Sequence, residues 1–288
     1  MSEHSPRKYK IMLMILPVGV VIGTIVFMVA YFKMERDEER QRAVIASYGL
    51  RVEDLSDMVG KLTDRIGPRD HGSESGRRGM KQASAMIEGR LGPQNVGYKV
   101  EKGGGEAIGE WQWKSLWVDI EGRSAPEEVI IVAASYAGEG QDADATCLST
   151  VVMLASAMAR KEPARTLRFV FLPIAQSPNL QNQWILKHCL GADEQCVGIL
   201  GLQTMDEAPT AGGDEWQLWA PDDRDRVWWD VLRGRSSGAP EISGASVWLG
   251  ASVFSPQAWQ DRRHDRLQRT VSLASELQSW LLSVASAE

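Results

Sequence analysis

The stretch Glu128–Ala134 reads EVIIVAA, and no charged side chain follows its first residue. An unbroken run of β-branched and small apolar residues is typical of a strand that is buried on both faces, in the middle of a parallel sheet. Similar runs occur at Leu167–Leu172 (LRFVFL), Val197–Leu202 and Val247–Phe254. We predict that these four segments are strands of one sheet.

Helical patterns separate these runs along the chain. We predict helices over Ser149–Arg160 and Leu180–Cys189, and a long closing helix over His264–Val284. Strands that alternate with helices indicate an α/β domain, with a mostly parallel sheet flanked by helices. Functional sites of such sheets lie at the carboxyl ends of the strands.

The residues before the first apolar run also show a regular pattern. Apolar residues at 3-4-3-4 spacing predict an amphipathic helix from Val52 to Ile66, which packs against either the domain or a partner. Ser73 or Ser75 can cap a second helix that ends at Leu91. Short strands over Tyr98–Glu101 and Leu116–Glu121 then flank a glycine-rich turn.

Near the N-terminus, Ile11–Phe32 comprises 22 residues without a charge. A bilayer span needs about 20 apolar residues, so this segment predicts one transmembrane helix. We expect a tail over 1–10, the span over 11–32, stalk helices over 33–66 and the α/β domain over 67–288. Lys and Arg are nearly balanced across the span. The shortness of the tail favours a cytoplasmic N-terminus and an extracytoplasmic domain, which is periplasmic in a bacterium.

Composition excludes several classes of protein. The net charge of −6 argues against a nucleic-acid partner, which needs a basic surface. Three Cys are too few for a disulfide-dense scaffold or a Cys-rich zinc site. The four His are scattered without a His-x-x-x-His pair, which makes a His-rich metal centre doubtful.

Several short motifs occur in a characteristic order: Ile66–Arg69 (IGPR) with Gly72-Ser73, then Gly97–Val100, Glu128–Ala134 and Arg165–Phe171. With these motifs, the chain from Leu62 onward resembles the zinc aminopeptidase family, whose members hold two adjacent zinc ions on an α/β exopeptidase fold. The resemblance implies that fold for this chain.

The resemblance also implies where metal ligands would stand. This chain has other residues there, namely Ser135 (for His), Ala137 (Asp), Ala145 (the bridging Asp), Ala175 and Gln176 (paired Glu), Gln203 (Asp) and Ser255 (His). Ser, Ala and Gln do not bind Zn²⁺ tightly, and Ala accepts no proton. We therefore expect a degenerate, inactive member of the family with no metal and no other cofactor.

These observations favour a non-catalytic, membrane-anchored subunit that scaffolds a larger membrane protein complex, in contact with the lipid bilayer and with other membrane subunits. The family includes catalytically dead, membrane-anchored members that act as receptors or complex subunits. Two alternatives stay open. One is a zinc-independent hydrolase with a relocated site, using Asp142, Asp144 and Asp206. The other is a binding module that holds a peptide or small ligand in the vacated cleft.

Tryptophan and cysteine provide further candidates. Tryptophan is enriched at protein interfaces and at membrane surfaces, so we expect partner or lipid contacts among two groups. These groups are Trp111, Trp113 and Trp117, which can share one face of a hairpin, and Trp216, Trp219, Trp228 and Trp229. Cys189 and Cys196 either form a disulfide in an oxidising compartment or remain free core thiols.

Overall fold

The computed structural model describes residues 24, 26–33, 50–105, 107–108, 111–205, 216–219, 245–252 and 256–286. The chain divides into two compact units, Met1–Ile45 and Ala46–Glu288. In the first unit, residues 26–33 are helical. Val26, Phe27 and Phe32 are each more than half exposed there. No helix among the described residues is long and apolar enough to cross a membrane. Most of the predicted span over 11–32 lies outside these residues.

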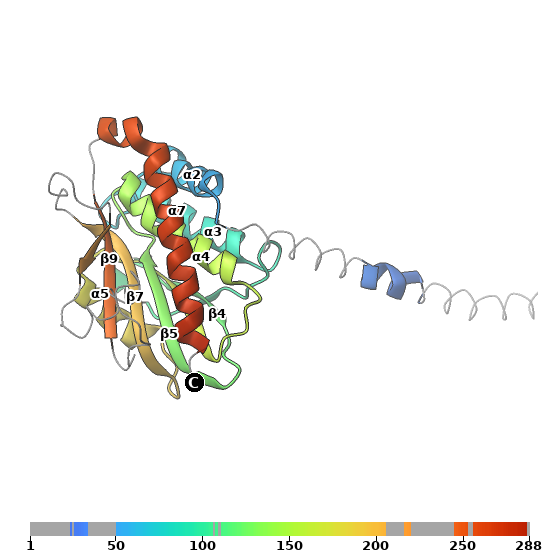
Figure 1. The fold of residues 1–288 in the computed structure, drawn as a ribbon. Helices are drawn as coiled ribbons and strands as arrows, with labels where there is room; N and C mark the ends of the chain where they lie inside the picture. Colours follow the sequence, from blue (N-terminus) through green and yellow to red (C-terminus); the bar gives the residue numbers. More distant parts are fainter. Residues whose placement is uncertain are drawn as a thin grey trace, which may run out of the picture. The chain divides into compact units, whose positions relative to one another are not determined.

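The second unit is built on a seven-stranded sheet with the order β1-β4-β6-β5-β7-β9-β8 (Figure 1). Its strands, in chain order, are β1 (Glu101–Gly103), β4 (Ser115–Ile120), β5 (Ala125–Ser135), β6 (Arg165–Leu172), β7 (Gln195–Met205), β8 (Trp216–Trp219) and β9 (Ala245–Ser252). The four central strands β6, β5, β7 and β9 are parallel, as their apolar sequences predict.

The outer strands differ from the prediction, because β1, β4 and β8 all run antiparallel to their neighbours. The sheet is therefore mixed, with a parallel centre. No strand was predicted over β8, a run of only four residues, and β1 begins where the predicted strand Tyr98–Glu101 ends. Between β1 and β4 in the sequence, β2 (Ala107–Ile108) and β3 (Trp111–Gln112) pair as a small separate ribbon.

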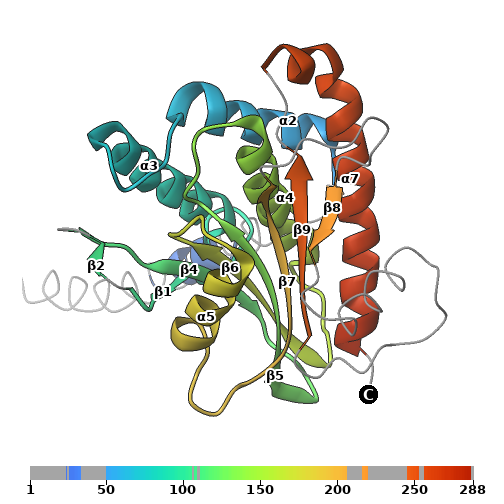
Figure 2. The same ribbon diagram turned by 90° about the vertical axis from the view of Figure 1, so that its left-hand side faces the viewer.

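Helices cover both faces of the sheet. They are α2 (Val52–Gly60), α3 (Glu74–Leu91), α4 (Asp142–Met158), α5 (Pro178–His188) and α7 (Pro256–Ser286). On β5, Val129, Ile131 and Ala133 pack in one apolar cluster with Trp184 of α5. The alternate residues of β5 point to the other face, where α4 contacts the sheet. Figure 2 shows α5 and α7 on opposite sides of the sheet.

Two helices begin earlier than the sequence predicts, α4 and α7; α7 begins at Pro256, eight residues before the predicted start at His264. Ser73 is the N-cap of α3 and accepts a hydrogen bond from the Gly76 N–H, so Ser73 rather than Ser75 caps this helix. Helix α4 begins at Asp142, seven residues before the predicted start at Ser149. The segment from Asp142 to Leu148 carries polar residues that suggested a loop, yet most of it is buried.

The amphipathic segment Val52–Ile66 is helical, but it is part of the domain. Helix α2 continues directly into a π-helix, η1 (Lys61–Ile66), and Leu55, Val59 and Leu62 are buried. Helix α2 contacts α4 and α7. Helix α2 and η1 therefore pack within the Ala46–Glu288 unit, although they lie in the predicted stalk over 33–66. Residues 34–49 of the predicted stalk lie outside the described residues.

Candidate functional site

The carboxyl ends of the parallel strands meet at one edge of the sheet, where the predicted site falls. Ser135 ends β5 and pairs with Leu172, the last residue of β6. Gln203 of β7 follows Leu202, which pairs with Ala134 of β5. The register of the strands alone thus places Ser135 and Gln203 at this edge.

An amide side chain from α5 joins the loop after β6 to the same edge. The Gln181 Nε2 donates to the Gln176 carbonyl oxygen at 2.6 Å and to the Gln203 Oε1 at 3.0 Å. Gln181 is only 1% exposed, and its Oε1 is buried with no hydrogen-bond partner among the described residues. The structure therefore brings Gln176 and Gln203 together through a third glutamine that the sequence analysis did not single out.

The remaining predicted positions are not gathered into one constellation. The Ser135 hydroxyl has carbonyl acceptors at 2.9 Å in Ala137 and at 3.3 Å in Leu172. Ala175 is exposed, whereas Ala137 and Ala145 are buried. Ser255 lies outside the described residues. The Ser135 hydroxyl thus bonds the chain's own backbone.

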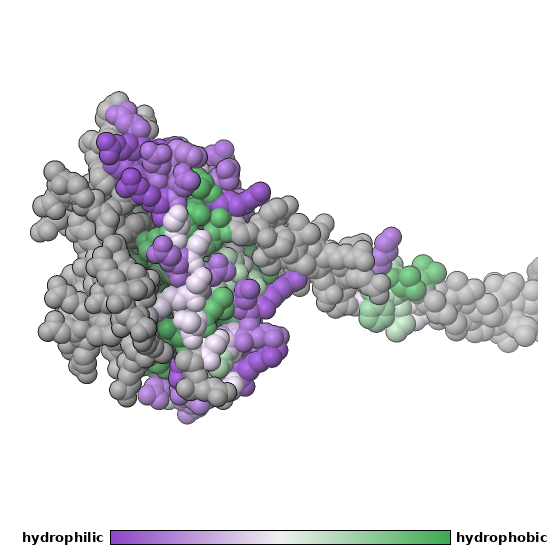
Figure 3. All heavy atoms as spheres, in the orientation of Figure 1, coloured by the Kyte–Doolittle hydropathy of each residue, from purple (hydrophilic) through white to green (hydrophobic). Residues whose placement is uncertain are grey.

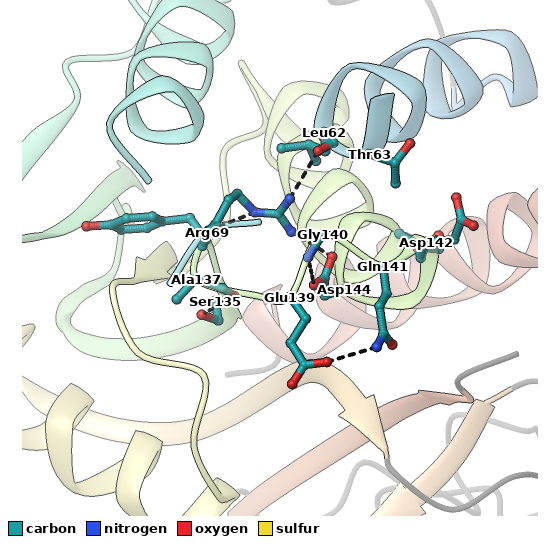
Figure 4. A network of polar contacts seen from close by, with 12 residues as sticks. Leu62, Thr63, Arg69, Ser135, Ala137, Glu139, Gly140, Gln141, Asp142 and Asp144 are labelled. Atoms are coloured by element: carbon teal, nitrogen blue, oxygen red, sulfur yellow. Dashed lines mark hydrogen bonds and ion pairs between the residues drawn. The ribbon is translucent and has the colours of Figure 1, made fainter. Parts of the chain in front are cut away.

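A buried arginine lies beside this edge and ties several segments together. Arg69 is fully buried, and its Nη2 donates to the Asp144 Oδ1 at 2.6 Å. Its Nε donates to the Tyr136 carbonyl, and its Nη1 donates to the carbonyls of Leu62 and Gly67. In Figure 4 the guanidinium lies between η1 and the loop that follows β5.

Backbone hydrogen bonds position the groups that bind Arg69. In η1 the Gly67 N–H bonds the Leu62 carbonyl, an i→i+5 bond that ends the π-helix, and Gly67 has a φ of +72°. The backbone of Arg69 also exchanges two hydrogen bonds with that of Gly138, at 2.7 and 2.8 Å. On the other side, the Asp144 Oδ2 accepts the Gly140 N–H at 3.0 Å. Both carboxylate oxygens of Asp144 are thereby engaged within the protein.

The carboxylates proposed for a relocated site have different surroundings. Asp142 is half-buried at the start of α4. Burial raises the pKa of its carboxyl, Arg263 opposes that rise, and Asp64 and Asp144 add to it. Asp144 is bound to Arg69, and Asp206 lies outside the described residues. Glu139 and Gln141 are exposed and hydrogen-bond each other at 2.9 Å (Figure 4).

The residues present do not fit the zinc ions of the family. Within the described part of the chain, no three His, Cys, Asp or Glu side chains gather closely enough to hold a metal ion. At the strand ends the side chains are a hydroxyl and amides, and the nearby Asp144 is already neutralised by Arg69. Zinc in proteins is held by imidazole, thiolate and carboxylate ligands, so we assign it no role here.

One histidine lies near the edge, although no sequence signal pointed to it. The His71 Nε2 is 2.7 Å from the Pro173 carbonyl oxygen. A carbonyl only accepts, so Nε2 carries a hydrogen. The Nδ1 atom is buried and has no hydrogen-bond partner among the described residues. The ring meets Trp113 edge-on, at 5.5 Å between centroids.

Trp111, Trp113 and Trp117, which the sequence analysis placed on one hairpin, lie in different parts of the fold. Strand β3 ends at Gln112 and β4 begins at Ser115, so the three residues do not belong to one strand. Trp113 is 6% exposed. Trp117 packs against the apolar cluster under α5, with the Arg168 guanidinium 5.7 Å from its ring centroid. Trp216 and Trp219 lie in β8, whereas Trp228 and Trp229 lie outside the described residues.

Cys189 and Cys196 are free thiols. Cys189 belongs to the apolar cluster under α5, and Cys196 packs against it. Burial raises the pKa of each of these two thiols to about 11. Of the two alternatives for Cys189 and Cys196, the structure has the unpaired thiols.

Comparison with known proteins shows which solved structures have a similar fold. No family model matches the sequence, and no curated protein matches it. Among solved structures, the LapA aminopeptidase of Legionella pneumophila is similar, with a TM-score of 0.56 and 9% identity over 88% of this chain and 75% of that one. The zinc aminopeptidase BSAP of Bacillus subtilis is similar with a TM-score of 0.55 and 8% identity, over 79% of this chain and 94% of that one.

A glutaminyl cyclase from Fimbriiglobus ruber is also similar, with a TM-score of 0.50 and 13% identity over 82% of this chain and 96% of that one. Identities this low demonstrate likeness of fold alone. The Ala46–Glu288 unit, with its parallel-centred sheet between two helical layers, therefore has the zinc aminopeptidase-like α/β fold.

Proposed function

We propose that this protein is a non-catalytic, membrane-anchored accessory subunit of a larger membrane protein complex, with its aminopeptidase-like domain outside the cytoplasm. The observation that carries the proposal is the chemistry of the strand ends. Ser135, Gln176 and Gln203 stand where the resemblance implies ligands, and all three are neutral. A two-zinc hydrolase needs anionic ligands and a base at these positions.

The hydrogen bonding at this edge supports the same proposal. Ser135 bonds backbone carbonyls, Gln203 accepts from Gln181, and Asp144 is paired with buried Arg69. A functional metal centre keeps its carboxylates and imidazoles directed at the metal. Here the side chains bond each other and the backbone, which suits a scaffold.

The uncharged segment over 11–32 is the proposed anchor in the lipid bilayer. The described residues 26–33 at its end expose large apolar side chains, which suits contact with lipid. Membrane confinement and an inactive domain together suggest that other membrane subunits are the partners.

Metal analysis tests the non-catalytic part of the proposal. We expect the full chain, purified in mild detergent and incubated with Zn²⁺, to retain far less than one zinc per chain after gel filtration. We also expect no chelator-sensitive aminopeptidase activity. A zinc aminopeptidase such as BSAP, treated identically, is the positive control. Stoichiometric zinc, or activity abolished by a chelator, would refute the proposal.

The subunit role needs a separate experiment. Extraction of the tagged full chain from native membranes in mild detergent, followed by mass spectrometry, should recover the same membrane proteins in constant ratio. Extraction in a denaturing detergent is the control and should release them. Recovery of this chain with no other membrane protein would contradict a subunit role.

A hydrolase with a relocated site is the second candidate, because two of the similar structures are aminopeptidases and because burial raises the pKa of Asp142 at the start of α4. This reading predicts a metal-independent peptidase activity that Asp142→Asn abolishes. Glu276→Gln, on the exposed side of α7, is the matched control and should leave that activity unchanged.

A further inference from the structure

Helix α5 lies in a part of the chain that has no acidic side chains. Residues 163–192 contain no Asp or Glu, although the whole chain has 38 of them and a net charge of −6. Its exposed residues, which we call the α5 surface, are Asn179, Leu180, Gln183, Leu186 and Lys187. Among the described residues of the Ala46–Glu288 unit, the large apolar side chains that are exposed are Leu180 at 47% and Leu186 at 51%.

The other helices of the described domain expose different side chains. Helix α2 exposes Glu53 and Asp57, and α3 exposes Glu74. Helix α7 exposes Glu276 and several serines, among them Ser279. Figure 3 shows that side of the molecule as largely hydrophilic to neutral along α7. Among these helices, α5 alone combines exposed leucines and a cation with the absence of acidic residues.

We propose that the α5 surface docks on the anionic surface of the lipid bilayer, a proposal that rests on the membrane anchor proposed above. Leu180 and Leu186 enter the headgroup region, as the apolar side chains of helices that lie in the plane of the interface do. The long stem of Lys187 lets its ammonium reach lipid phosphates, which attract cations. The Asn179 and Gln183 amides can donate to the same phosphates.

The small size of the α5 surface favours lipid over a protein partner. A stable protein interface buries about 800 Å² on each side, of which two half-exposed leucines supply a small part. Lipid docking has no such threshold here, because the proposed anchor already holds the chain at the membrane. A tether raises the effective concentration of the second contact, so a weak contact suffices. The absence of acidic residues matters for the same reason, since anionic headgroups would repel them.

The length of chain between the anchor and the domain allows this docking. Residues 34–49 separate the helical residues 26–33 from the described start of the domain at residue 50. Sixteen residues span at most about 55 Å when fully extended. A domain of this size has a radius of gyration of roughly 18 Å. The connection is therefore long enough for any face of the domain to reach the bilayer.

A fluorophore on α5 tests the docking in the full chain. The Gln183→Cys variant is labelled with the polarity-sensitive fluorophore NBD and reconstituted into phosphatidylcholine vesicles with or without phosphatidylglycerol. With phosphatidylglycerol, we expect emission at shorter wavelength and severalfold stronger quenching by a spin-labelled lipid. The same label on Ser279→Cys, on the exposed side of α7, should remain in water. The unsubstituted chain, treated identically, corrects for labelling of the native cysteines.

A second substitution checks that the leucines cause the docking. Leu186→Glu in the Gln183→Cys background should reduce the quenching severalfold, while circular dichroism shows an unchanged fold. Ser279→Glu in the same background is the matched control and should leave the quenching unchanged. No spectral shift at residue 183, or equal shifts at residues 183 and 279, would overturn the docking. So would a shift in native membranes that is absent from lipid vesicles, because it would assign the surface to a protein partner.

Flotation of the vesicles reports on the anchor separately. A chain that does not float with the vesicles would refute the anchor and this docking together. A chain that floats but shows no shift at residue 183 would refute the docking alone. Neither result alters the zinc measurement that tests the non-catalytic role.

Discussion

At the scale of single residues, Arg69 is the most heavily engaged side chain near the site. Its guanidinium donates to three carbonyls and to Asp144, and it has no exposed surface. Removal of one partner from a buried ion pair leaves an uncompensated charge in a poorly hydrated place. The resemblance marked Arg69 as part of a motif, but only the structure shows its partner.

We predict that Arg69→Met lowers the free energy of unfolding by about 3–5 kcal/mol, because it leaves the Asp144 carboxylate without its cation and three carbonyls without their donor. Urea unfolding of the full chain in mild detergent, followed by tryptophan fluorescence, measures this. Arg78→Met is the matched control, since Arg78 pairs with Glu74 at 3.3 Å on an exposed surface. Its loss should stay below about 1 kcal/mol. Similar losses in both variants would show that the Arg69 pair has no special role.

At the scale of elements, α3 shows how one helix is fitted to the turn before it. Gly79 faces the segment that leads from η1 to α3, and a Cβ at this position would lie 2.1 Å from the Pro68 carbonyl oxygen. Gly89, in the same helix, has nothing within 4 Å of its would-be Cβ. The close approach at Gly79 holds α3 against the backbone that positions Arg69.

The two glycines therefore predict opposite effects of the same substitution. Gly89→Ala should stabilise the protein by about 0.5–1 kcal/mol, because alanine restricts the unfolded chain and favours the helix. Gly79→Ala should destabilise it by about 1–3 kcal/mol, because the new methyl forces α3 away from Pro68. Thermal unfolding of both variants measures the difference. Equal shifts of the unfolding midpoint would refute the tight packing at Gly79.

At the scale of the whole molecule, one buried arginine links several segments at the end of the sheet that lies opposite the site. Arg168 of β6 donates to Asp119 of β4 at 2.8 Å and to Glu194, which precedes β7, at 2.6 and 2.9 Å. It also donates to the Cys189 carbonyl at the end of α5, at 2.6 Å. Three segments of the fold thus meet at one guanidinium.

This network predicts a dependence of stability on acid. Burial raises the pKa of the Glu194 carboxyl, but hydrogen bonds from Arg168 and Gly191 outweigh burial and hold the pKa below its ordinary value of 4.5. The folded state therefore binds fewer protons than the unfolded state in this window. The contribution of Glu194 is complete above about pH 5 and is lost as the pH falls through the folded pKa.

Glu194→Gln should remove this contribution. We expect the variant to be less stable than the unsubstituted chain at pH 7 and to lose less stability as the pH falls from about 5 to about 3. Urea midpoints across that range provide the measurement. Glu276→Gln, an exposed position on α7, should keep the original slope. An unchanged slope in Glu194→Gln would show that other carboxylates govern acid unfolding.

Sequence patterns predicted elements better than they predicted contacts. The apolar runs of β5, β6, β7 and β9 located the parallel centre, because strands covered on both faces leave a continuous apolar signal. The first half of α4 was missed because Asp142, Asp144 and Thr146 suggest a loop. The tryptophans were misplaced because their alternation continues across the break between β3 and β4.

The sequence by itself determined the α/β class, the central strands and the neutral residues at the predicted ligand positions. These features depend on hydrophobic periodicity or on residue chemistry, which are local. Only the tertiary structure decided that Arg69 pairs with Asp144, 75 residues away, that Gln181 joins Gln176 to Gln203, and that the edge strands are antiparallel. Such pairings depend on which elements the folded sheet brings together, and no local pattern encodes that proximity.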